Sequence, residues 1–210
     1  MLSYNNQVVF WDNVYNDPKL QFPENDGFLS NWVDQLRKAK RIVDLGCGNG
    51  VNTLFLQEHG IQTISCDFSE PALNLLLMRI PDAAVLLFDM RSGLPFLSNN
   101  IDAVIADLSL HYFSFEDTTA IVREIHRSLS PGGLFICRVN ALDSAMSFQG
   151  YQEIEKDYYE MDGCTKRFFT VESLGDFLSG FSIKKLYEEE TGKYRSAKKT
   201  IVCEAYKKAE

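Results

Sequence analysis

Short apolar runs recur along the middle of the chain, and segments with helical spacing separate them. Three segments, 51–59, 70–79 and 116–129, have helix-like patterns. Strands that alternate with helices in this way are typical of a parallel sheet covered on both faces. The pattern therefore predicts a doubly wound α/β fold with right-handed connections. The strand-like runs are RIVDL, QTISCD, AAVLLFD, DAVIADLSL and GLFICRVN.

Capping residues place two of the helix ends. Ser69 stands before Glu70 and Pro71, as expected for an N-cap followed by proline in the first turn. The proline and two glycines at 131–133 are predicted to stop the preceding helix near Ser130.

The two ends of the chain have other patterns. The first forty residues carry several aromatic side chains and an amphipathic segment at 28–36, which predicts covering helices. These helices either cover the edge of the core or form a lid over a bound ligand. After Asn140 comes a polar and aromatic stretch at 147–169, then a helix-like segment at 171–178. Two closing strands are expected near 181–187 and 200–206.

Composition narrows the class of protein. The chain has 210 residues, 45% of them hydrophobic and 24% charged, which fits one well-buried domain. No run approaches the ~18 to 20 apolar residues of a membrane-spanning helix. The N-terminal residues have neither the basic nor the apolar region of a signal peptide, so we expect a cytoplasmic protein without membrane partners.

The net charge argues against a nucleic-acid-binding site, and the spacing of the cysteines argues against a zinc or redox site. The net charge of −8 opposes binding to nucleic acid, which usually selects a clustered basic surface. The five cysteines are odd in number, widely spaced and never in a CxxC pair, so we expect buried thiols in a reducing compartment. No cluster with the spacing of metal ligands is visible.

A glycine-rich turn is the strongest chemical signal. Asp44, Gly46, Cys47 and Gly48 stand where an apolar strand turns into a helix. Glycines allow a bound molecule to approach the backbone closely, and the free N–H groups of a helix start favour negative charge. Such a turn lies at the carboxyl ends of the strands, where open α/β sheets bind ligands.

The spacing of the turn separates two cofactor classes. A dinucleotide fingerprint needs glycine or alanine at the position that Val51 occupies, so a nicotinamide dinucleotide is disfavoured. An acid just before the first glycine would repel a pyrophosphate. Asp44 instead suits a ligand that brings its own cation, such as the ammonium-bearing end of S-adenosylmethionine (SAM).

Three further acids end successive predicted strands. Asp67 follows the glycine turn by about 20 residues, where a carboxylate accepts hydrogen bonds from ribose hydroxyls. Asp89, with Met90 beside it, suits an adenine amino group and ring, and Asp107 closes the fourth strand. Each acid taken singly is also typical of a helix cap or a loop. Four acids on one edge of a sheet are together the signature of a ligand site.

These motifs resemble, in order, those of the class I SAM-dependent methyltransferases. The resemblance covers residues 40–140 in detail and implies a Rossmann-like seven-stranded sheet, mostly parallel, with an antiparallel last strand. It also implies one domain over 1–210, with covering helices at 1–39, a SAM-binding half at 40–140, and a substrate-side insert with the closing strands at 141–210. The motifs are VDLGCGNG, CDFS, FDM, ADLSLHYF and LSPGGLF. WDNVY near the start and RFFTVESL near the end are similar to the small-molecule branch that includes tellurite-resistance-like methyltransferases.

The resemblance assigns residues to the cofactor, SAM, and to its product S-adenosylhomocysteine (SAH). It implies that Asp44 and the glycine turn line the methionine end, that Asp67 binds the ribose, and that Asp107 and Leu108 flank the sulfonium. Three residues would bind the adenine: Phe68, Asp89 and Met90. Further candidates for the cofactor site are Cys47, Asn52, Trp11 and Tyr15.

The acceptor side offers fewer signals. His111, four residues after Asp107, is the candidate general base, because the usual histidine pKa suits neutral pH; the alternative is a packed histidine after a strand. Tyr112 is a candidate acceptor contact, and Arg138 is another because a cation at a strand end would bind an anionic acceptor. Other polar candidates are Asn140, Tyr158, Tyr159, Arg167, Tyr194 and Arg195.

The absence of two motifs of nucleic-acid methyltransferases narrows the class of methyl acceptor. The fourth motif reads DLSLHY rather than Asp-Pro-Pro-Tyr, and no Pro-Cys pair is present for attack on a pyrimidine. With the acidic charge, this favours a small-molecule acceptor over nucleic acid, with a protein side chain as the lesser option. Two other functions stay open: a SAM- or SAH-binding sensor without turnover, and an NAD(P)-dependent oxidoreductase.

Overall fold

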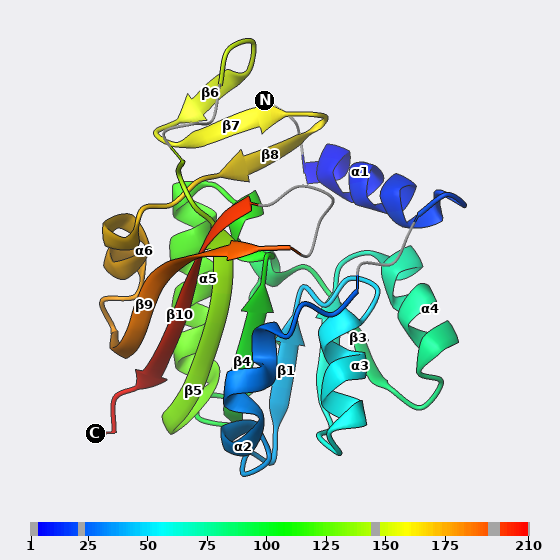
Figure 1. The fold of residues 1–210 in the computed structure, drawn as a ribbon, viewed down its shortest axis with the longest axis vertical. Coiled ribbons are helices and arrows are strands. Elements are labelled where there is room, and N and C mark those ends of the chain that lie inside the picture. Colours follow the sequence, from blue (N-terminus) through cyan, green and yellow to red (C-terminus); the bar gives the residue numbers. More distant parts are fainter. Residues whose placement is uncertain (1–3, 21–23, 144–147, 193–197, 210) are drawn as a thin grey trace.

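A single seven-stranded sheet carries the fold (Figure 1). The computed structural model describes residues 4–20, 24–143, 148–192 and 198–209. The strands lie in the order β3 (Ala84–Leu87), β2 (Ile64–Asp67), β1 (Ile42–Leu45), β4 (Ile101–Asp107), β5 (Leu129–Asn140), β10 (Lys198–Lys207) and β9 (Phe181–Thr191). Five strands are parallel, and β10 runs antiparallel to both β5 and β9. This confirms the expected doubly wound sheet with an antiparallel last strand.

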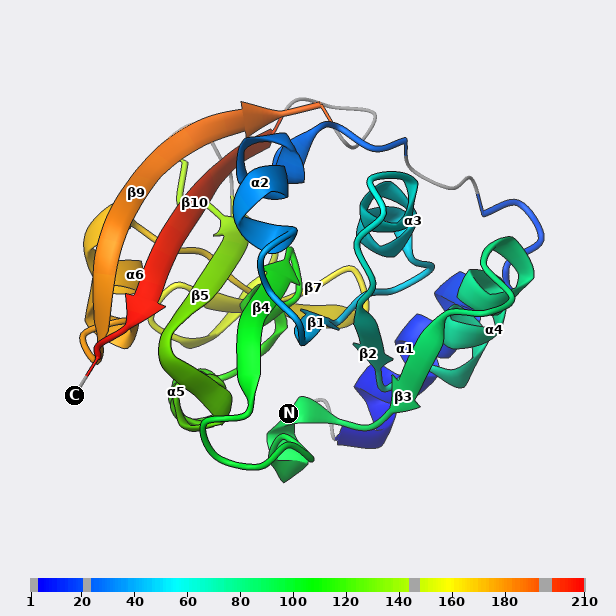
Figure 2. The same ribbon diagram turned by 90° about the horizontal axis from the view of Figure 1, so that it is seen from below.

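Helices cover both faces of the sheet. Figure 2 shows α5 and α6 on one face and α2 and α3 on the other, while α4 lies beside β3. No helix in the described part of the chain is long and apolar enough to cross a membrane. The α-helices are α1 (Tyr4–Asn16), α2 (Val33–Leu36), α3 (Val51–Glu58), α4 (Glu70–Arg79), α5 (Phe115–Ser128) and α6 (Val171–Phe177). The 3-10 helices are η1 (Phe28–Trp32), η2 (Met90–Ser92) and η3 (Leu110–Tyr112).

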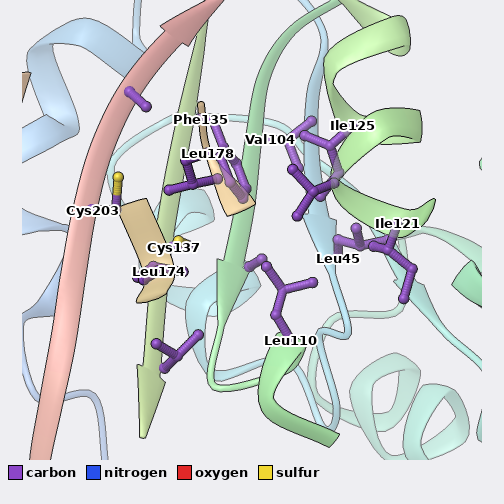
Figure 3. Close-up of a cluster of buried hydrophobic side chains, with 14 of the residues drawn as sticks. Leu45, Val104, Leu110, Ile121, Ile125, Phe135, Cys137, Leu174, Leu178 and Cys203 are labelled. Atoms are coloured by element: carbon purple, nitrogen blue, oxygen red, sulfur yellow. The ribbon is translucent and has the colours of Figure 1, made fainter. Parts of the chain in front are cut away.

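Alternation along the central strands produces two cores. In β5, Phe135 and Cys137 point to the face that α5 and α6 cover, whereas Leu134 and Ile136 point to the face covered by η1, α2 and α3. Figure 3 shows the first core, where Ile121 and its neighbours on α5 pack over β1, β4 and β5. Both faces are apolar because both are buried, so the central strands lack the polar alternation of a half-exposed sheet.

The start of α4 and the end of α5 can be compared with the helix ends expected from the sequence. Ser69 caps α4, because its hydroxyl accepts a hydrogen bond from the Ala72 N–H at 3.4 Å. α5 ends at Ser128, close to the expected end near Ser130, and β5 begins at the next residue. The proline and glycines at 131–133 lie inside β5, where its register with β4 shifts. They mark a bulge in a strand rather than a helix stop.

A second, three-stranded antiparallel sheet occupies the stretch that sequence analysis left without regular structure. It consists of β6 (Gln152–Glu155), β7 (Tyr158–Met161) and β8 (Cys164–Arg167). Asp162 and Gly163 link β7 to β8, both with positive φ (52° and 84°). Asp-Gly is the usual sequence of a tight hairpin turn, so this signal was present in the chain. The small sheet lies beside α1 (Figure 1), and the Gln7 amide of α1 donates a hydrogen bond to the Thr165 hydroxyl of β8.

Phe135 tests the packing of the larger core. Its ring is fully buried and lies 5.5 Å from the ring of Phe181, centroid to centroid. We expect Phe135→Ala to lower the free energy of unfolding by about 3–5 kcal/mol, because the cavity loses both burial and contacts. Leu97→Ala is the control, since Leu97 is 75% exposed, and should change stability by no more than about 0.5 kcal/mol. Urea unfolding measures both; equal effects would contradict this packing.

Candidate active site

A pocket of about 880 Å³ opens at the carboxyl ends of the parallel strands. The glycine turn and the strand ends form one part of its wall, and α1, the segment that follows α1, β8 and the beginning of β10 form other parts. Among residues expected at the cofactor or acceptor, those that line it are Trp11, Tyr15, Gly46, Cys47, Gly48, Asp67, Phe68, Met90, Asp107, Leu108, His111, Tyr112 and Asn140. Segments far apart in the sequence therefore meet at one place, as parallel strand ends must.

The glycine turn is shaped by contacts that exclude side chains. Gly46 has φ +75°, and a Cβ there would lie 2.4 Å from the Cβ of Ser109. A Cβ on Gly48 would lie 2.5 Å from the Tyr15 hydroxyl. The N–H groups of Gly46 and Cys47 both donate to the Cys66 carbonyl, at 2.8 and 2.9 Å. The turn is thus held against β2, and Ser109 and Tyr15 occupy the space that side chains at Gly46 and Gly48 would need.

Asp67 ties the glycine turn to the end of β2. One carboxylate oxygen accepts the Gly48 N–H and the other accepts the Ser69 N–H, each at 2.9 Å. Burial raises the pKa of Asp67, and the hydrogen bonds from the Ser69 and Gly48 N–H groups oppose that rise. Each oxygen keeps further acceptor capacity for a ligand hydroxyl.

Asp44 lies beneath the turn instead of lining the pocket. It is 1% exposed, and its carboxylate accepts a hydrogen bond from the Thr53 hydroxyl at 3.0 Å. Thr53 in turn lies 2.8 Å from the hydroxyl of Ser65. In this structure Asp44 fixes α3 against the sheet, whereas the sequence analysis assigned it to the methionine end of the cofactor.

Asp89 also lies outside the pocket lining. Its carboxylate forms a two-pronged ion pair with the Arg91 guanidinium, at 3.1 and 2.8 Å, and accepts the Arg91 N–H at 2.9 Å. The expected contact with an adenine amino group would compete with this ion pair. Met90, the next residue, does line the pocket with its apolar side chain.

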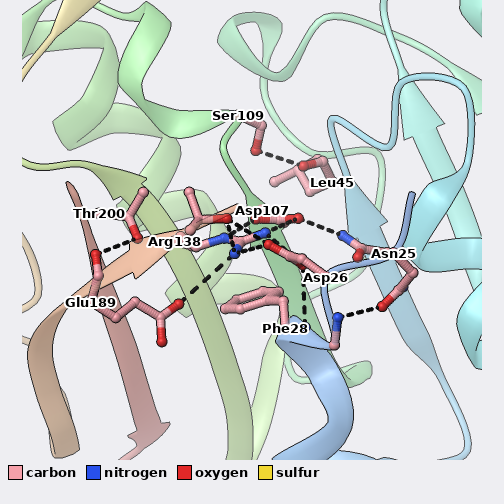
Figure 4. A network of polar contacts seen from close by, with 12 residues as sticks. Asn25, Asp26, Phe28, Leu45, Asp107, Ser109, Arg138, Glu189 and Thr200 are labelled. Carbon is pink, nitrogen blue, oxygen red and sulfur yellow. Dashed lines mark hydrogen bonds and ion pairs between the residues drawn. The ribbon is translucent and has the colours of Figure 1, made fainter. Parts of the chain in front are cut away.

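Arg138 lies at the centre of a buried charge network (Figure 4). Asp107 and Arg138 are direct neighbours on β4 and β5, and the guanidinium donates to both Asp107 oxygens, at 2.7 and 3.0 Å. A second edge of the guanidinium binds Asp26 at 2.6 Å. Asn52 donates to Asp107 at 3.1 Å, so this candidate cofactor residue also serves the network.

The network changes the assignment of Arg138. Its side chain is 1% exposed and does not line the 880 Å³ pocket. Two carboxylates already fill the positions that an anionic acceptor would take. The geometry therefore does not support the expectation that Arg138 binds the acceptor. The sequence alone could not show that Asp107 and Asp26 surround its guanidinium.

Leu108 holds a backbone conformation that is rare for a leucine. It follows Asp107 with φ +56°, and its N–H donates to the Arg138 carbonyl at 2.8 Å. A strained residue at a strand end persists only where its surroundings fix it, and such residues cluster at functional sites. The bend turns the chain so that Leu108, Ser109 and His111 all line the pocket.

His111 is buried in the pocket wall as a neutral imidazole. It is 2% exposed, and its Nδ1 has no hydrogen-bond partner among the described residues. Burial lowers its pKa to about 3, and the positive charges of Lys166 and Lys198 add to the effect. Its proposed role as a general base rested on a pKa near neutrality, which this environment removes.

Some of the remaining candidate acceptor residues line the pocket, and others do not. Tyr112 lines the pocket, and its ring meets that of Trp11 edge to face at 5.0 Å; Asn140 lines it too. Tyr158, Tyr159 and Arg167 belong to the small sheet and are not among the lining residues. Tyr194 and Arg195 lie outside the described residues. The sequence analysis missed Lys166 and Lys198, since no local pattern distinguishes them from surface lysines. Across the described ranges, no three His, Cys, Asp or Glu side chains are grouped to hold a metal.

The central part of the chain is similar to known methyltransferases. Residues 43–137 match the family model of a methyltransferase domain. A demethylmenaquinone methyltransferase of Corynebacterium kroppenstedtii is 36% identical over 102 residues, which are 48% of this chain and 42% of that protein. The chain covers less than half the length of the first curated relatives that it matches.

Solved structures share the fold at low sequence identity. A SAM-dependent methyltransferase from Methanosarcina mazei superposes with a TM-score of 0.76 at 19% identity, over 89% of this chain and 100% of that one. A Burkholderia thailandensis 1,6-didemethyltoxoflavin N1-methyltransferase, with 1,6-didemethyltoxoflavin and SAH bound, superposes with a TM-score of 0.68 at 17% identity. The match covers 98% of this chain and 85% of that one.

Removing the central cation tests the charge network. Arg138→Gln should lower the free energy of unfolding by about 3–5 kcal/mol, because it leaves the carboxylates of Asp107 and Asp26 without their cation. The control is Arg37→Gln, which breaks a pair with Asp34 whose side chains are 53% and 87% exposed. That change should cost less than about 1 kcal/mol. Equal losses in urea unfolding would show that the buried network adds no stability.

His111 predicts a pH dependence of stability. Its folded pKa is about 3, below the ordinary value of 6.5. Since a depressed folded pKa stabilises the protein only above the unfolded pKa, this contribution is lost as pH falls from 6.5 towards 3. The parent should lose about 1.4 kcal/mol per pH unit more than His111→Asn in this range. Urea unfolding of both proteins between about pH 5 and 7.5 measures this; parallel curves would contradict the burial of a neutral imidazole.

Proposed function

We propose that this protein transfers a methyl group from SAM to a small molecule, because it has the fold of SAM-dependent methyltransferases and its residues 43–137 match the family model of a methyltransferase domain. The observation that carries the proposal is the joint geometry of the glycine turn and Asp67. A bare backbone turn and a buried carboxylate, bonded to each other, lie at the strand ends in a pocket of about 880 Å³.

The residues present fit this cofactor. Gly46, Cys47 and Gly48 line the pocket, so a bound ligand would meet the glycine turn directly. Asp67 would accept hydrogen bonds from the ribose hydroxyls while it still holds the turn. Phe68 and Met90 line the pocket and would pack on the adenine.

When bound, SAM supplies a methyl group on a positively charged sulfur, ready for in-line displacement. The protein has to align the acceptor and exclude water. Trp11 and Tyr15 of α1 stack on each other, with ring centroids 5.9 Å apart, and both line the pocket. Asp12 fixes this helix to the site, since its carboxylate accepts the Ser69 hydroxyl at 2.6 Å. In the proposal α1 acts as the cover of the site.

His111 would take part as a neutral hydrogen-bonding group. Its low pKa makes it a weak base, so an acceptor that must lose a proton would have to lose it elsewhere. This supports an acceptor that reaches the site with a free lone pair or already ionised.

The N-terminal and C-terminal parts of the chain would form the part of the pocket that binds the methyl acceptor. In this proposal residues 40–140 hold the cofactor, while residues 1–39 and 141–210 supply the cover and the acceptor wall of one domain. WDNVY and RFFTVESL support the finer assignment to the branch that includes tellurite-resistance-like methyltransferases. One protein of similar fold, the 1,6-didemethyltoxoflavin N1-methyltransferase, holds 1,6-didemethyltoxoflavin together with SAH, which supports a small-molecule acceptor.

Calorimetric titration with SAM, SAH and NADH tests the cofactor. We expect SAM and SAH to bind and NADH not to bind, because Val51 occupies the position that a dinucleotide fingerprint gives to glycine. Asp67→Ala should weaken SAM binding about 100-fold or more, through the loss of charge-assisted hydrogen bonds to two hydroxyls. Asp82→Ala, on the exposed turn before β3, is the matched control. Unchanged SAM affinity in Asp67→Ala would defeat the assignment.

Methyl-labelled SAM separates turnover from binding alone. We expect label to move from SAM into low-molecular-weight products when the protein is incubated with the small-molecule fraction of a cell extract. A SAM-binding sensor would leave all of the label on SAM.

A further inference from the structure

The main sheet ends in a long, open edge. β9 pairs with β10 on one side, and no other strand in the described part of the chain pairs with it. Figure 2 shows β9 as the outermost strand, at the end of the sheet opposite β3. It has 11 residues, and two of its apolar side chains, Ile183 and Tyr187, are 38% and 36% exposed. Proteins usually keep such edges short or covered, because the free N–H and C=O groups accept a further strand.

Charge divides this edge into two halves. The sequence FSIKKLYEEET of β9 has two lysines before Leu186 and three glutamates after Tyr187. Lys184 and Lys185 both bind the buried carboxylate of Glu204, at 3.1 and 3.2 Å. One carboxylate balances one of the two lysines, so this half keeps a net positive charge. The lysine side chains are also 57% and 47% exposed, which leaves them within reach of a partner.

The other half of the edge is negative. Glu189 lies 3.8 Å from the Arg138 guanidinium, which also binds two other carboxylates. Glu188 and Glu190 are exposed and form no ion pair with the described residues. Lys199, which is opposite Glu190 on β10, binds a different carboxylate, at 3.4 Å. Three consecutive glutamates thus leave an excess of negative charge at this end of β9.

A second copy of β9 complements both halves when it runs antiparallel. In a symmetric dimer the twofold axis is perpendicular to the joined sheet. Opposite side chains then lie on the same face, so the axis passes through a residue and not between two residues. With the axis at Tyr187, Lys185 stands opposite Glu189 of the second copy, and Lys184 stands opposite its Glu190. Symmetry forms each of these pairs twice.

Neighbouring registers match less well. An axis at Leu186 places Lys185 opposite Tyr187, and an axis at Glu188 places two glutamates opposite each other. Like charges directly opposite each other destabilise a strand pair, whereas opposite charges and aromatic pairs stabilise it. The register centred on Tyr187 is therefore the one that the sequence of β9 favours.

A bulge limits what this edge accepts. The register of β9 with β10 shifts beside Lys184, so the regular stretch begins at Lys185. Bulges and lysines on an edge normally discourage pairing. Here they disfavour strands with another charge pattern, and they leave residues 185–189 regular for a strand that carries glutamates opposite the lysines.

We propose that β9 is a dimer interface, in which it pairs antiparallel with β9 of a second copy of this chain about a twofold axis at Tyr187. The two seven-stranded sheets then join into one continuous sheet. Backbone hydrogen bonds hold the strands together, and the tyrosine pair and the Lys–Glu pairs fix the register. This inference is independent of the proposed methyl transfer.

Sedimentation equilibrium of the whole chain tests the dimer. We expect a mass of twice 23.9 kDa that falls towards 23.9 kDa on dilution. Because the Lys–Glu pairs lie at an exposed edge, raising NaCl from about 0.05 to 0.5 M should weaken the dimer. A mass of 23.9 kDa at every protein concentration up to about 100 µM would overturn the proposal.

A cysteine at the axis tests the register. Opposite Cα atoms in an antiparallel pair lie about 4.5–5.5 Å apart, which a disulfide spans. Oxidised glutathione should therefore cross-link Tyr187→Cys into a covalent dimer. Ser182→Cys is the matched control on the same exposed strand, because its two copies would lie about 30 Å apart. Equal cross-linking of both variants, or none in Tyr187→Cys, would refute this pairing.

Reversal of one charge tests the complementarity. Glu190→Lys brings a lysine opposite Lys184 of the second copy, so the dimer should dissociate about 10-fold or more readily. Glu58→Lys makes the same charge change at an exposed position on α3 and should leave the dimer unchanged. Sedimentation equilibrium measures both variants. Equal weakening by both, or by neither, would contradict the charge pairing.

Discussion

The buried ion pair between Asp107 and Arg138 joins the parts that form the pocket. The two residues are register neighbours on β4 and β5, and the pair is 1% exposed on both sides. A charge of either sign left alone there would cost several kcal/mol, so each residue requires the other. Asn52 brings the start of α3 to the same carboxylate, and Asp26 brings the segment before η1 to the same guanidinium. The glycine turn, the strand ends and the N-terminal segment are thereby fixed relative to one another.

Charged side chains from several elements line the pocket. Asp67, with the glycine turn, presents acceptor oxygens where a ribosylated cofactor would lie. Lys166 of β8 and Lys198 of β10 line the other side, and burial, with a further contribution from these two charges, lowers the pKa of His111.

The three-stranded sheet and α1 add walls to the pocket beyond the ends of the parallel strands. Contacts such as the one from Gln7 to Thr165 link the first helix to β8, although 158 residues separate them in the sequence. The Tyr158 hydroxyl also donates to Thr165, at 2.6 Å, so the junction is a connected polar cluster. These hydrogen bonds hold α1 against the small sheet.

The sequence by itself determined the sheet, its mostly parallel order and the strand ends at which Gly46, Asp67, Met90 and Asp107 meet. These follow from local signals, since alternation, caps and glycine spacing act within a few residues. Only the tertiary structure decided the roles of Asp44, Asp89 and Arg138, because a charged side chain is defined by the partner that burial gives it. It also decided the pKa of His111 and the meeting of Lys166 with Lys198, since electrostatic effects depend on distance in space and on burial, neither of which a linear pattern records.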